Sequence, residues 1–227
     1  MPIKAVLFCV IFILGISATP LIAASLEIKV TDSQQLAISD AVIELFPAQI
    51  SAGQLSTVTK PSAAKAFEMF QKNRTFVPFV LAVPKGTHVD FPNLDRTRHH
   101  VYSFSEAKPF ELKLYIGKTE SPVLFDNPGL VALGCNIHDY MQAFIYVAES
   151  PFVAVTDENG ELTFDDLPQG QYQVKIWHPW QTTVMPLSEL KISTEQAKLA
   201  INLAIEHQAK PSAPAAGFGT QTNLKGP

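Results

Sequence analysis

Apolar residues recur at every second position along most of this chain. Between residues 66 and 150 the alternation forms eight short runs, each bounded by Pro, Gly, Asn or Asp. The runs are AFEMF, TFVPFVLAV, HVDFPN, HHVYSF, FELKLYI, SPVLFD, LVALGC and AFIYVA. A period of two is the period of a β-strand. Eight short strands within about 85 residues predict a compact Greek-key sandwich.

Further alternating runs lie on both sides of this segment and predict a second, smaller β-sandwich. In KLAINLAIE the apolar residues occupy every second position, which predicts a strand although its alanines would also suit a helix. The pair Asn159-Gly160 lies between two alternating runs and predicts a hairpin turn. The fold class is therefore predicted to be all-β. The other flanking runs are IKVTD, AVIELF, FVAVTD, ELTFDD, YQVKIWH and SELKIS.

A short repeat links the two ends of the chain. Val30-Thr31-Asp32 is echoed by Val155-Thr156-Asp157, which suggests that residues 25–47 and 151–207 belong to one lobe. We therefore expect the domain of residues 66–150 to be inserted into that lobe. In the alternative, tandem topology, the N-terminal strands would join the 66–150 domain.

The remaining segments are predicted to lie outside both lobes. The basic start MPIK and the apolar run AVLFCVIFILGI predict a secretory signal peptide over residues 1–24, with cleavage before Ser25. The run is too short to span a bilayer, and no second stretch is long enough. Residues 48–65 read as a polar linker, and 208–227 as a disordered tail rich in Pro, Gly and Ala. The protein is therefore expected to be exported to the periplasm.

Composition narrows the function in two ways. The net charge of −4 argues against a nucleic-acid partner, which favours a basic surface. Of the two cysteines, Cys9 would be lost with the signal peptide, so that Cys135 would be the one thiol of the exported chain. A lone thiol in an oxidising compartment indicates intermolecular pairing, reactivity or metal binding.

The stretch GCNIHDYMQAFIYV gives that thiol a chemical context. Cys135, His138 and Met141 follow one another at intervals of three residues, after a predicted strand. Two imidazoles, one thiolate and a distant thioether suit copper that changes its oxidation state. A loop this short cannot surround an ion alone, and His99 in RHHVYSF, 36 residues upstream, offers a further ligand.

Two other interpretations of these residues remain open at this point. The apolar residues of the stretch also fit one face of an amphipathic helix, in which Cys135 and Met141 would be core residues. A tetrahedral zinc site could be built from His99, His100, Cys135 and His138. The zinc site would leave the methionine without a role.

The pattern resembles the blue copper proteins, or cupredoxins. Cys-x-x-His-x-x-Met is similar to the short ligand loop of amicyanin, and FVPFVLAVPKGTHVDFPNLD and LFDNPG resemble the segments around it. The flanking segment VTDENGELTFDDLPQGQYQVKIWHP resembles a transthyretin-like or carboxypeptidase regulatory-like sandwich. The whole chain resembles bacterial periplasmic proteins labelled methylamine utilization proteins.

The resemblance implies a role for each ligand of a mononuclear copper site. His99 and His138 would donate imidazole nitrogens, Cys135 the thiolate, and Met141 a weak axial sulfur. A cofactor of this kind would cycle between Cu(I) and Cu(II).

Two residues depart from the family pattern and are candidates for contacts to the ligands. His100 stands where such proteins usually have Asn, which puts the usual hydrogen bond across the loop in question. Asp139 stands where amicyanin-like loops have Pro, and its carboxylate would influence the neighbouring ligand.

The function expected from this resemblance is one-electron transfer, not enzymatic catalysis. The partner would be a redox protein, such as a dehydrogenase or a cytochrome, docking where the His138 edge lies in an apolar patch with Tyr140, Met141 and Phe144. No motif for hydrolysis or phosphoryl transfer occurs in the sequence. The alternatives are a periplasmic copper carrier, and a metal-free binding module that uses the transthyretin-like lobe.

Overall fold

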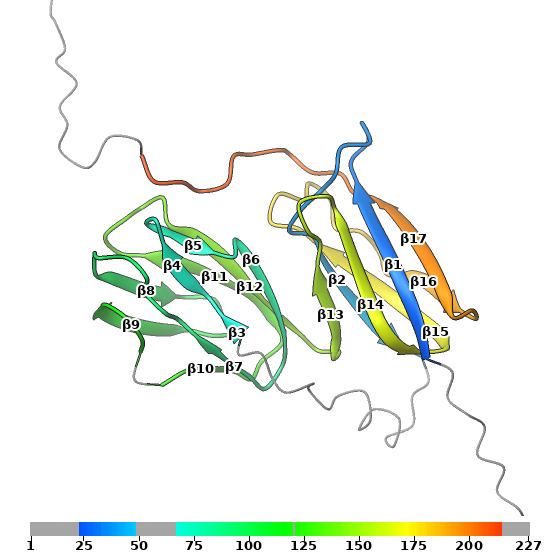
Figure 1. The fold of residues 1–227 in the computed structure, drawn as a ribbon, viewed down its shortest axis with the longest axis horizontal. Coiled ribbons are helices and arrows are strands. Elements are labelled where there is room, and N and C mark those ends of the chain that lie inside the picture. Colours follow the sequence, from blue (N-terminus) through cyan, green and yellow to red (C-terminus); the bar gives the residue numbers. More distant parts are fainter. Residues whose placement is uncertain (1–22, 49–66, 120, 215–227) are drawn as a thin grey trace, which may run out of the picture.

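The computed structural model describes residues 23–48, 67–119 and 121–214, which form seventeen strands and no helix. The strands gather into two lobes that lie side by side (Figure 1). The central lobe contains β3 (Phe67–Glu68), β4 (Phe70–Lys72), β5 (Thr75–Val77), β6 (Val80–Pro84), β7 (Thr87–Asp90), β8 (His99–Ser103), β9 (Phe110–Tyr115), β10 (Val123–Phe125), β11 (Gly129–Cys135) and β12 (Gln142–Ala148). The flanking lobe contains β1 (Ala23–Thr31), β2 (Val42–Pro47), β13 (Phe152–Val155), β14 (Glu161–Pro168), β15 (Gly170–Trp177), β16 (Ser188–Ile192) and β17 (Gln196–Asn202).

The central lobe is built around a five-stranded sheet in the order β6-β12-β11-β8-β9. A three-stranded sheet, β10-β7-β3, and the β4–β5 hairpin complete it. Side chains from these elements form one buried cluster that includes Met69, Phe91, Phe125, Val131 and Ile145. Because alternate residues of a strand face opposite sides, the period-two pattern puts these side chains in the core. The same cluster contains Cys135 and Met141, so the candidate site lies at one edge of the core.

The flanking lobe consists of two sheets, β14-β1-β17 and β13-β2-β15-β16. Leu26, Ile28 and Val30 of β1 are buried in its core, together with residues of β2 and β15. Strands β1 and β2 pair with β14, β17, β13 and β15, all of which follow the central lobe in the chain. This is the pairing expected for an inserted lobe. The exact division points at residues 66 and 150 stay a prediction.

The repeated Val-Thr-Asp triplets have a common structural role. The Oδ1 atom of Asp32 accepts hydrogen bonds from the backbone N–H groups of Gln34 and Leu36. Asp157 Oδ1 accepts them from the residues at the same spacing, Asn159 and Glu161. Each aspartate therefore stabilises a turn at the end of a strand of the flanking lobe.

The expected hairpin at Asn159-Gly160 is wrong, although the turn itself is present. Strand β13 pairs with β2, whereas β14 pairs with β1, so the turn carries the chain from one sheet to the other. Gly160 has a φ of +72°, and a Cβ atom there would collide with the carbonyl of Val30. Turn chemistry predicted the reversal of the chain but could not identify the pairing partner. Residues 198–202 of the run KLAINLAIE lie in β17, which confirms the strand prediction for that part, whereas the remaining four residues of the run lie beyond the end of β17.

Several predicted segments lie wholly or mainly outside the described residues. These are the signal peptide over 1–24, the linker over 48–65 and the tail over 208–227. Strand β1 begins at Ala23, two residues before the expected cleavage point. Across residues 23–48, 67–119 and 121–214, no helix has the length and apolar character that a membrane span requires.

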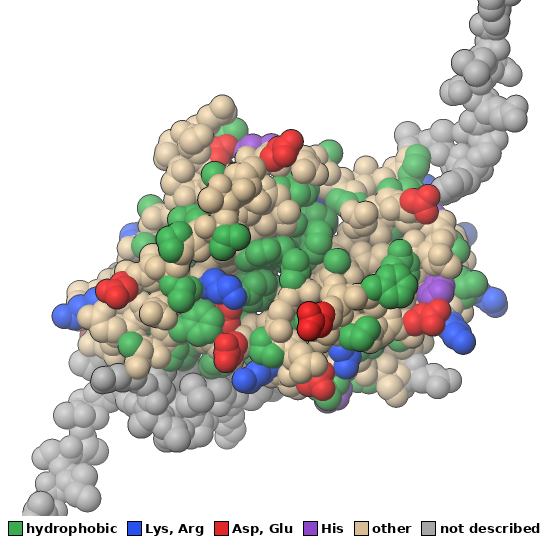
Figure 2. Space-filling model, turned by 180° about the vertical axis from the view of Figure 1, so that it is seen from behind, with side chains coloured by type: hydrophobic (Ala, Val, Ile, Leu, Met, Phe, Trp, Pro, Cys, Tyr) green, Lys and Arg blue, Asp and Glu red, His purple; other side chains and the backbone are tan. Residues whose placement is uncertain are grey.

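The two lobes meet across an aromatic and aliphatic cluster. Phe79, Val80 and Tyr146 of the central lobe pack with Val42 and Trp177 of the flanking lobe. Seen from behind, hydrophobic side chains gather near the middle of the molecule, where the lobes meet (Figure 2).

A buried carboxylate also joins the lobes at this junction. Glu44 of β2 is 2% exposed. It accepts hydrogen bonds from the Tyr146 hydroxyl at 2.7 Å and from the backbone N–H groups of Glu149 and Ser150 at 2.7 and 2.9 Å. Lys175 Nζ lies 3.9 Å from Glu44 Oε2, the oxygen that also accepts the Tyr146 hydroxyl. A buried carboxylate is tolerated only when it is paired in this way, so Glu44 fixes β12 and the following turn onto β2.

We predict that Glu44→Ala lowers the free energy of unfolding by about 3 kcal/mol, because three donors, two of them in buried bonds, lose their acceptor. Tyr146→Phe removes one donor and should cost about 1 kcal/mol. Chemical denaturation measures both. Glu27→Ala is the control, because its partner Lys198 is exposed and such pairs contribute little. An equal effect of Glu27→Ala and Glu44→Ala would contradict this role.

Candidate metal centre

Sheet pairing brings His99 to Cys135. Cys135 is the last residue of β11, which pairs antiparallel with β8 so that Cys135 lies opposite Val101. His99 precedes Val101 by two residues and therefore faces the same side of the sheet, toward the core. It is 0% exposed, and its Nδ1 atom lies 3.8 Å from Cys135 Sγ.

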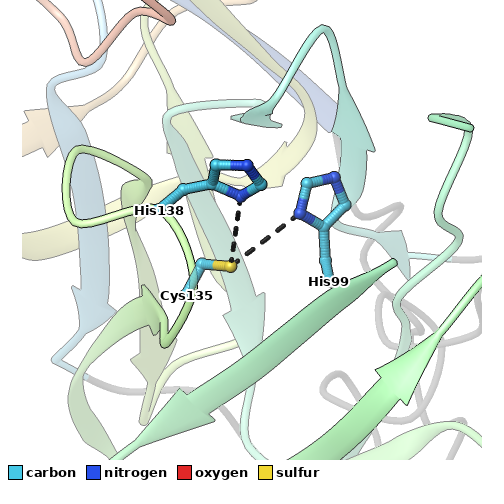
Figure 3. Close-up of side chains that lie close together, drawn as sticks. All are labelled: His99, Cys135 and His138. Carbon is cyan, nitrogen blue, oxygen red and sulfur yellow. Dashed lines mark hydrogen bonds between the residues drawn. The ribbon is translucent and has the colours of Figure 1, made fainter. Parts of the chain in front are cut away.

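His138 reaches the same sulfur from the loop between β11 and β12. This loop contains turns and no helix, so the helical interpretation of the stretch is wrong. The backbone N–H of Met141 donates to the carbonyl of His138 at 2.9 Å, which closes the loop. His138 Nδ1 then lies 3.7 Å from Cys135 Sγ, and both imidazole rings turn a nitrogen toward the sulfur (Figure 3).

Together these three side chains form a compact donor set. One donor atom from each of His99, Cys135 and His138 lies within 4.8 Å of the others, and all three residues are buried. Within the described ranges no other group of three His, Cys, Asp or Glu side chains is arranged to hold an ion. A thiolate with two imidazoles fits a mononuclear copper site.

Met141 is the last residue of this loop, directly before β12, and is 0% exposed. It belongs to the same buried cluster as Cys135, which is compatible with the axial role expected from the resemblance. That role stays a prediction. Because the side chain is fully buried, Met141 does not contribute to a surface patch for a partner.

The side chain of His100 points away from the donor set. Residues of β8 alternate, so His100 faces the opposite side from His99. Its Nε2 atom lies 2.7 Å from Glu111 Oε1, at ion-pair distance but without hydrogen-bond geometry. The four-residue zinc set is therefore not assembled. The backbone of His100 bridges the loop instead, because its carbonyl accepts the N–H of Asn136 at 3.2 Å.

A carboxylate outside the loop contacts the ligand candidate His99, while the influence expected of Asp139 on its neighbouring ligand stays a prediction. Asp139 is exposed on the loop. Asp95, which sequence reasoning did not single out, lies in the segment before β8, and its Oδ2 atom is 2.9 Å from His99 Nε2. The sequence contains only a weak signal for this contact, namely one acidic residue four positions before His99.

The charges of the site favour the form of cysteine that binds metals. Burial opposes ionisation of Cys135, but the hydrogen bond with His99 and backbone bonds from His100 and Ile137 outweigh it and lower the pKa of the thiol. Burial likewise opposes protonation of His99, yet its contacts with Cys135 and Asp95 raise its pKa. Burial, followed by the charge on His99, lowers the pKa of His138. Relative to the free side chains, the shifts at Cys135 and His99 favour the charged form of each, a thiolate and an imidazolium.

Comparison with known proteins identifies cupredoxin structures as partial likenesses. No protein-family model matches the sequence, and no curated protein does. A purple cupredoxin from Nitrosopumilus maritimus is 19% identical, with a TM-score of 0.33, and the match covers 36% of this chain and 99% of that one. A copper-containing nitrite reductase from Thermus scotoductus SA-01 is 25% identical, with a TM-score of 0.35, over 45% of this chain and 25% of that one. A variant of amicyanin in its reduced Cu(I) form is 19% identical, with a TM-score of 0.33, over 48% and 99% of the two chains.

We predict that His99→Ala raises the pKa of Cys135 in the metal-free protein, because the mutation removes the partner that stabilises the thiolate. The ultraviolet absorbance of the thiolate, followed against pH, gives the midpoint. His88→Ala serves as the control, since His88 is exposed on β7. A midpoint unchanged in His99→Ala would show that the two side chains do not interact as described.

Proposed function

We propose that this protein is an exported, mononuclear blue copper protein that carries single electrons between redox partners. One observation carries the proposal: two buried imidazole nitrogens and one buried thiol sulfur converge in a ready-made site at the edge of an all-β core. A copper ion held there would take up and release one electron. The proposed ligands are His99, Cys135 and His138, with Met141 as a weak axial donor.

The surrounding protein suits a centre whose geometry changes little. His99 is anchored in the paired strand β8, and Cys135 ends the central strand β11. Only His138 and Met141 come from a loop, and that loop is closed by the bond between their backbones. Because ligands held by paired strands resist displacement, the reorganisation that accompanies electron transfer would be small.

Burial of the donor set favours electron transfer over copper delivery. The most exposed of the three side chains, His138, is 6% exposed, so a bound ion would have little access to solvent or to an exchanging ligand. An electron carrier needs its ion to be retained, whereas a copper carrier must release it. A copper carrier and a metal-free binding module are therefore the alternatives that the copper titration below distinguishes.

We further propose that the partner is a redox protein, such as a dehydrogenase or a cytochrome, that docks over the loop bearing His138. Ile137, the neighbouring residue, is 41% exposed and offers apolar surface there. Tyr140 is half-buried and its ring centroid lies 5.7 Å from that of His138. A periplasmic location would follow from the signal peptide predicted for residues 1–24. The transthyretin-like character of the flanking lobe and the likeness to methylamine utilization proteins stay predictions.

Addition of copper(II) to the protein should produce an intense visible absorption band, because the copper–thiolate bond absorbs strongly. Cys135→Ser should abolish the band, and His88→Ala should preserve it because His88 is exposed outside the site. Tight binding of Cu(I) without the band would indicate a copper carrier. Failure to bind copper in either oxidation state would contradict the proposal and favour a metal-free module.

Met141→Leu should leave copper and the visible band in place but change the reduction potential, because the axial ligand tunes the potential. The two side chains have similar volumes, so stability should fall by less than about 1.5 kcal/mol. Met69→Leu is the matched control, since Met69 is also fully buried in this core. Loss of copper in Met141→Leu, or an equal change of potential in Met69→Leu, would contradict the axial role.

A further inference from the structure

The segment between β7 and β8 holds one carboxylate in an ordered position. The side chain of Asp95 is 14% exposed. Its Oδ1 accepts the backbone N–H of Asn73 at 2.7 Å, and its Oδ2 accepts that of Arg74 at 2.8 Å. The same Oδ2 lies 2.9 Å from Nε2 of His99. Three nitrogen atoms therefore surround a single carboxylate, and one belongs to a proposed copper ligand.

The two backbone donors come from a turn whose shape suits an anion. Asn73 and Arg74 connect β4 to β5, and both have positive φ angles, 56° and 58°. Two successive residues with positive φ form the tight turn of a two-residue hairpin. Their N–H groups point at Asp95, and this contact is part of what holds the pKa of that carboxyl below its usual value against the opposing effect of burial.

A second side chain fixes the loop that presents Asp95. Asn93 is buried, and its Oδ1 accepts the backbone N–H of Asp95 at 2.9 Å. Its Nδ2 donates to the carbonyls of Thr97 and Tyr115 at 2.9 and 2.8 Å. The backbone of Asn93 also pairs with Gly117, just beyond β9. The position of Asp95 is thus set by the loop and the turn, independently of His99.

We propose that Asp95 is the positioning residue of the metal centre, which accepts the Nε2–H of His99 and so leaves the Nδ1 lone pair directed at the site. Nδ1 is the atom that lies 3.8 Å from Cys135 Sγ. A histidine ligand is commonly oriented by a carboxylate on its second nitrogen, which fixes the tautomer and makes the ring a stronger donor. The effect of Asp95 on copper binding rests on the proposed function, whereas the contact between Asp95 and His99 does not.

The charge of Asp95 has a separate effect from its position. A carboxylate next to a ligand stabilises the more positive oxidation state of a bound ion, and therefore lowers its reduction potential. Asp95→Asn retains one oxygen that can accept both the Nε2–H of His99 and the N–H of Arg74. It loses the charge, and its NH2 group replaces the oxygen that accepts the N–H of Asn73. Asp95→Ala loses both the oxygens and the charge, and leaves the N–H groups of Asn73 and Arg74 without this acceptor. The two variants separate the two effects.

The first experiment uses the metal-free protein and needs no copper. Long-range proton–nitrogen correlation spectra report which nitrogen of His99 carries the proton. They are recorded at a pH where the ring is neutral, in a Cys135→Ala background that removes the sulfur facing Nδ1. In this background we expect the proton on Nε2 when residue 95 is Asp or Asn, and a mixture of both tautomers in Asp95→Ala. Asp126→Asn is the control, because Asp126 is exposed and pairs with Lys108. An unchanged Nε2–H tautomer in a folded Asp95→Ala would overturn the proposal.

The second experiment measures copper alone. Cu(I) titration should show an affinity about 10- to 100-fold lower in Asp95→Ala, the range typical when a residue that orients a metal ligand is removed. In Asp95→Asn the reduction potential should rise while most of the affinity is kept, and Asp126→Asn should show neither effect. Equal shifts of the reduction potential in Asp95→Asn and Asp126→Asn would overturn the proposed effect of the Asp95 charge. If the wild type binds no copper, the proposed function fails, and the tautomer experiment still decides the role of Asp95.

Discussion

The antiparallel pairing of β11 with β8 is the constraint on which the site depends. It places Cys135 opposite Val101, and thereby brings His99, 36 residues earlier in the chain, to the same end of the sheet. A slip of one residue would turn His99 to the solvent side and bring His100 inward, because successive side chains of a strand face opposite sides. The register is fixed by the buried residues of both strands, including Val101, Val131 and Leu133. The core that stabilises the lobe therefore also fixes the positions of two proposed metal ligands, His99 and Cys135.

Around this pair, several buried polar side chains have defined hydrogen-bond partners. Asn93 organises the segment before β8, and Asp95 meets both the β4–β5 turn and His99. At the lobe junction, Glu44 has the same relation to Tyr146 and the backbone after β12. Unpaired polar groups in such positions would be costly, so these contacts restrict how the loops can lie. Hydrogen bonds therefore help to order the loops near the site.

Much of the fold follows from local patterns in the sequence. Three of the four proposed ligands do so as well, because they lie close together in one loop. The period-two pattern predicts the strands, and the three-residue spacing within one loop predicts Cys135, His138 and Met141 as ligands. The long-range contacts could not be predicted in this way. Asp95 lies in a segment without periodicity, and its role depends on a turn 21 residues away that supplies Arg74. The Asn159-Gly160 turn was identified, but local turn chemistry does not specify which strands pair.

The central claim is that one copper ion is bound by two histidines and one cysteine. X-ray absorption at the copper edge of the loaded protein tests it most directly, because it counts the sulfur and nitrogen neighbours of the ion. The account predicts one short copper–sulfur contact and two copper–nitrogen contacts, with a weaker and longer sulfur from Met141. A copper ion bound only by nitrogen and oxygen, with no short contact to sulfur, would contradict it.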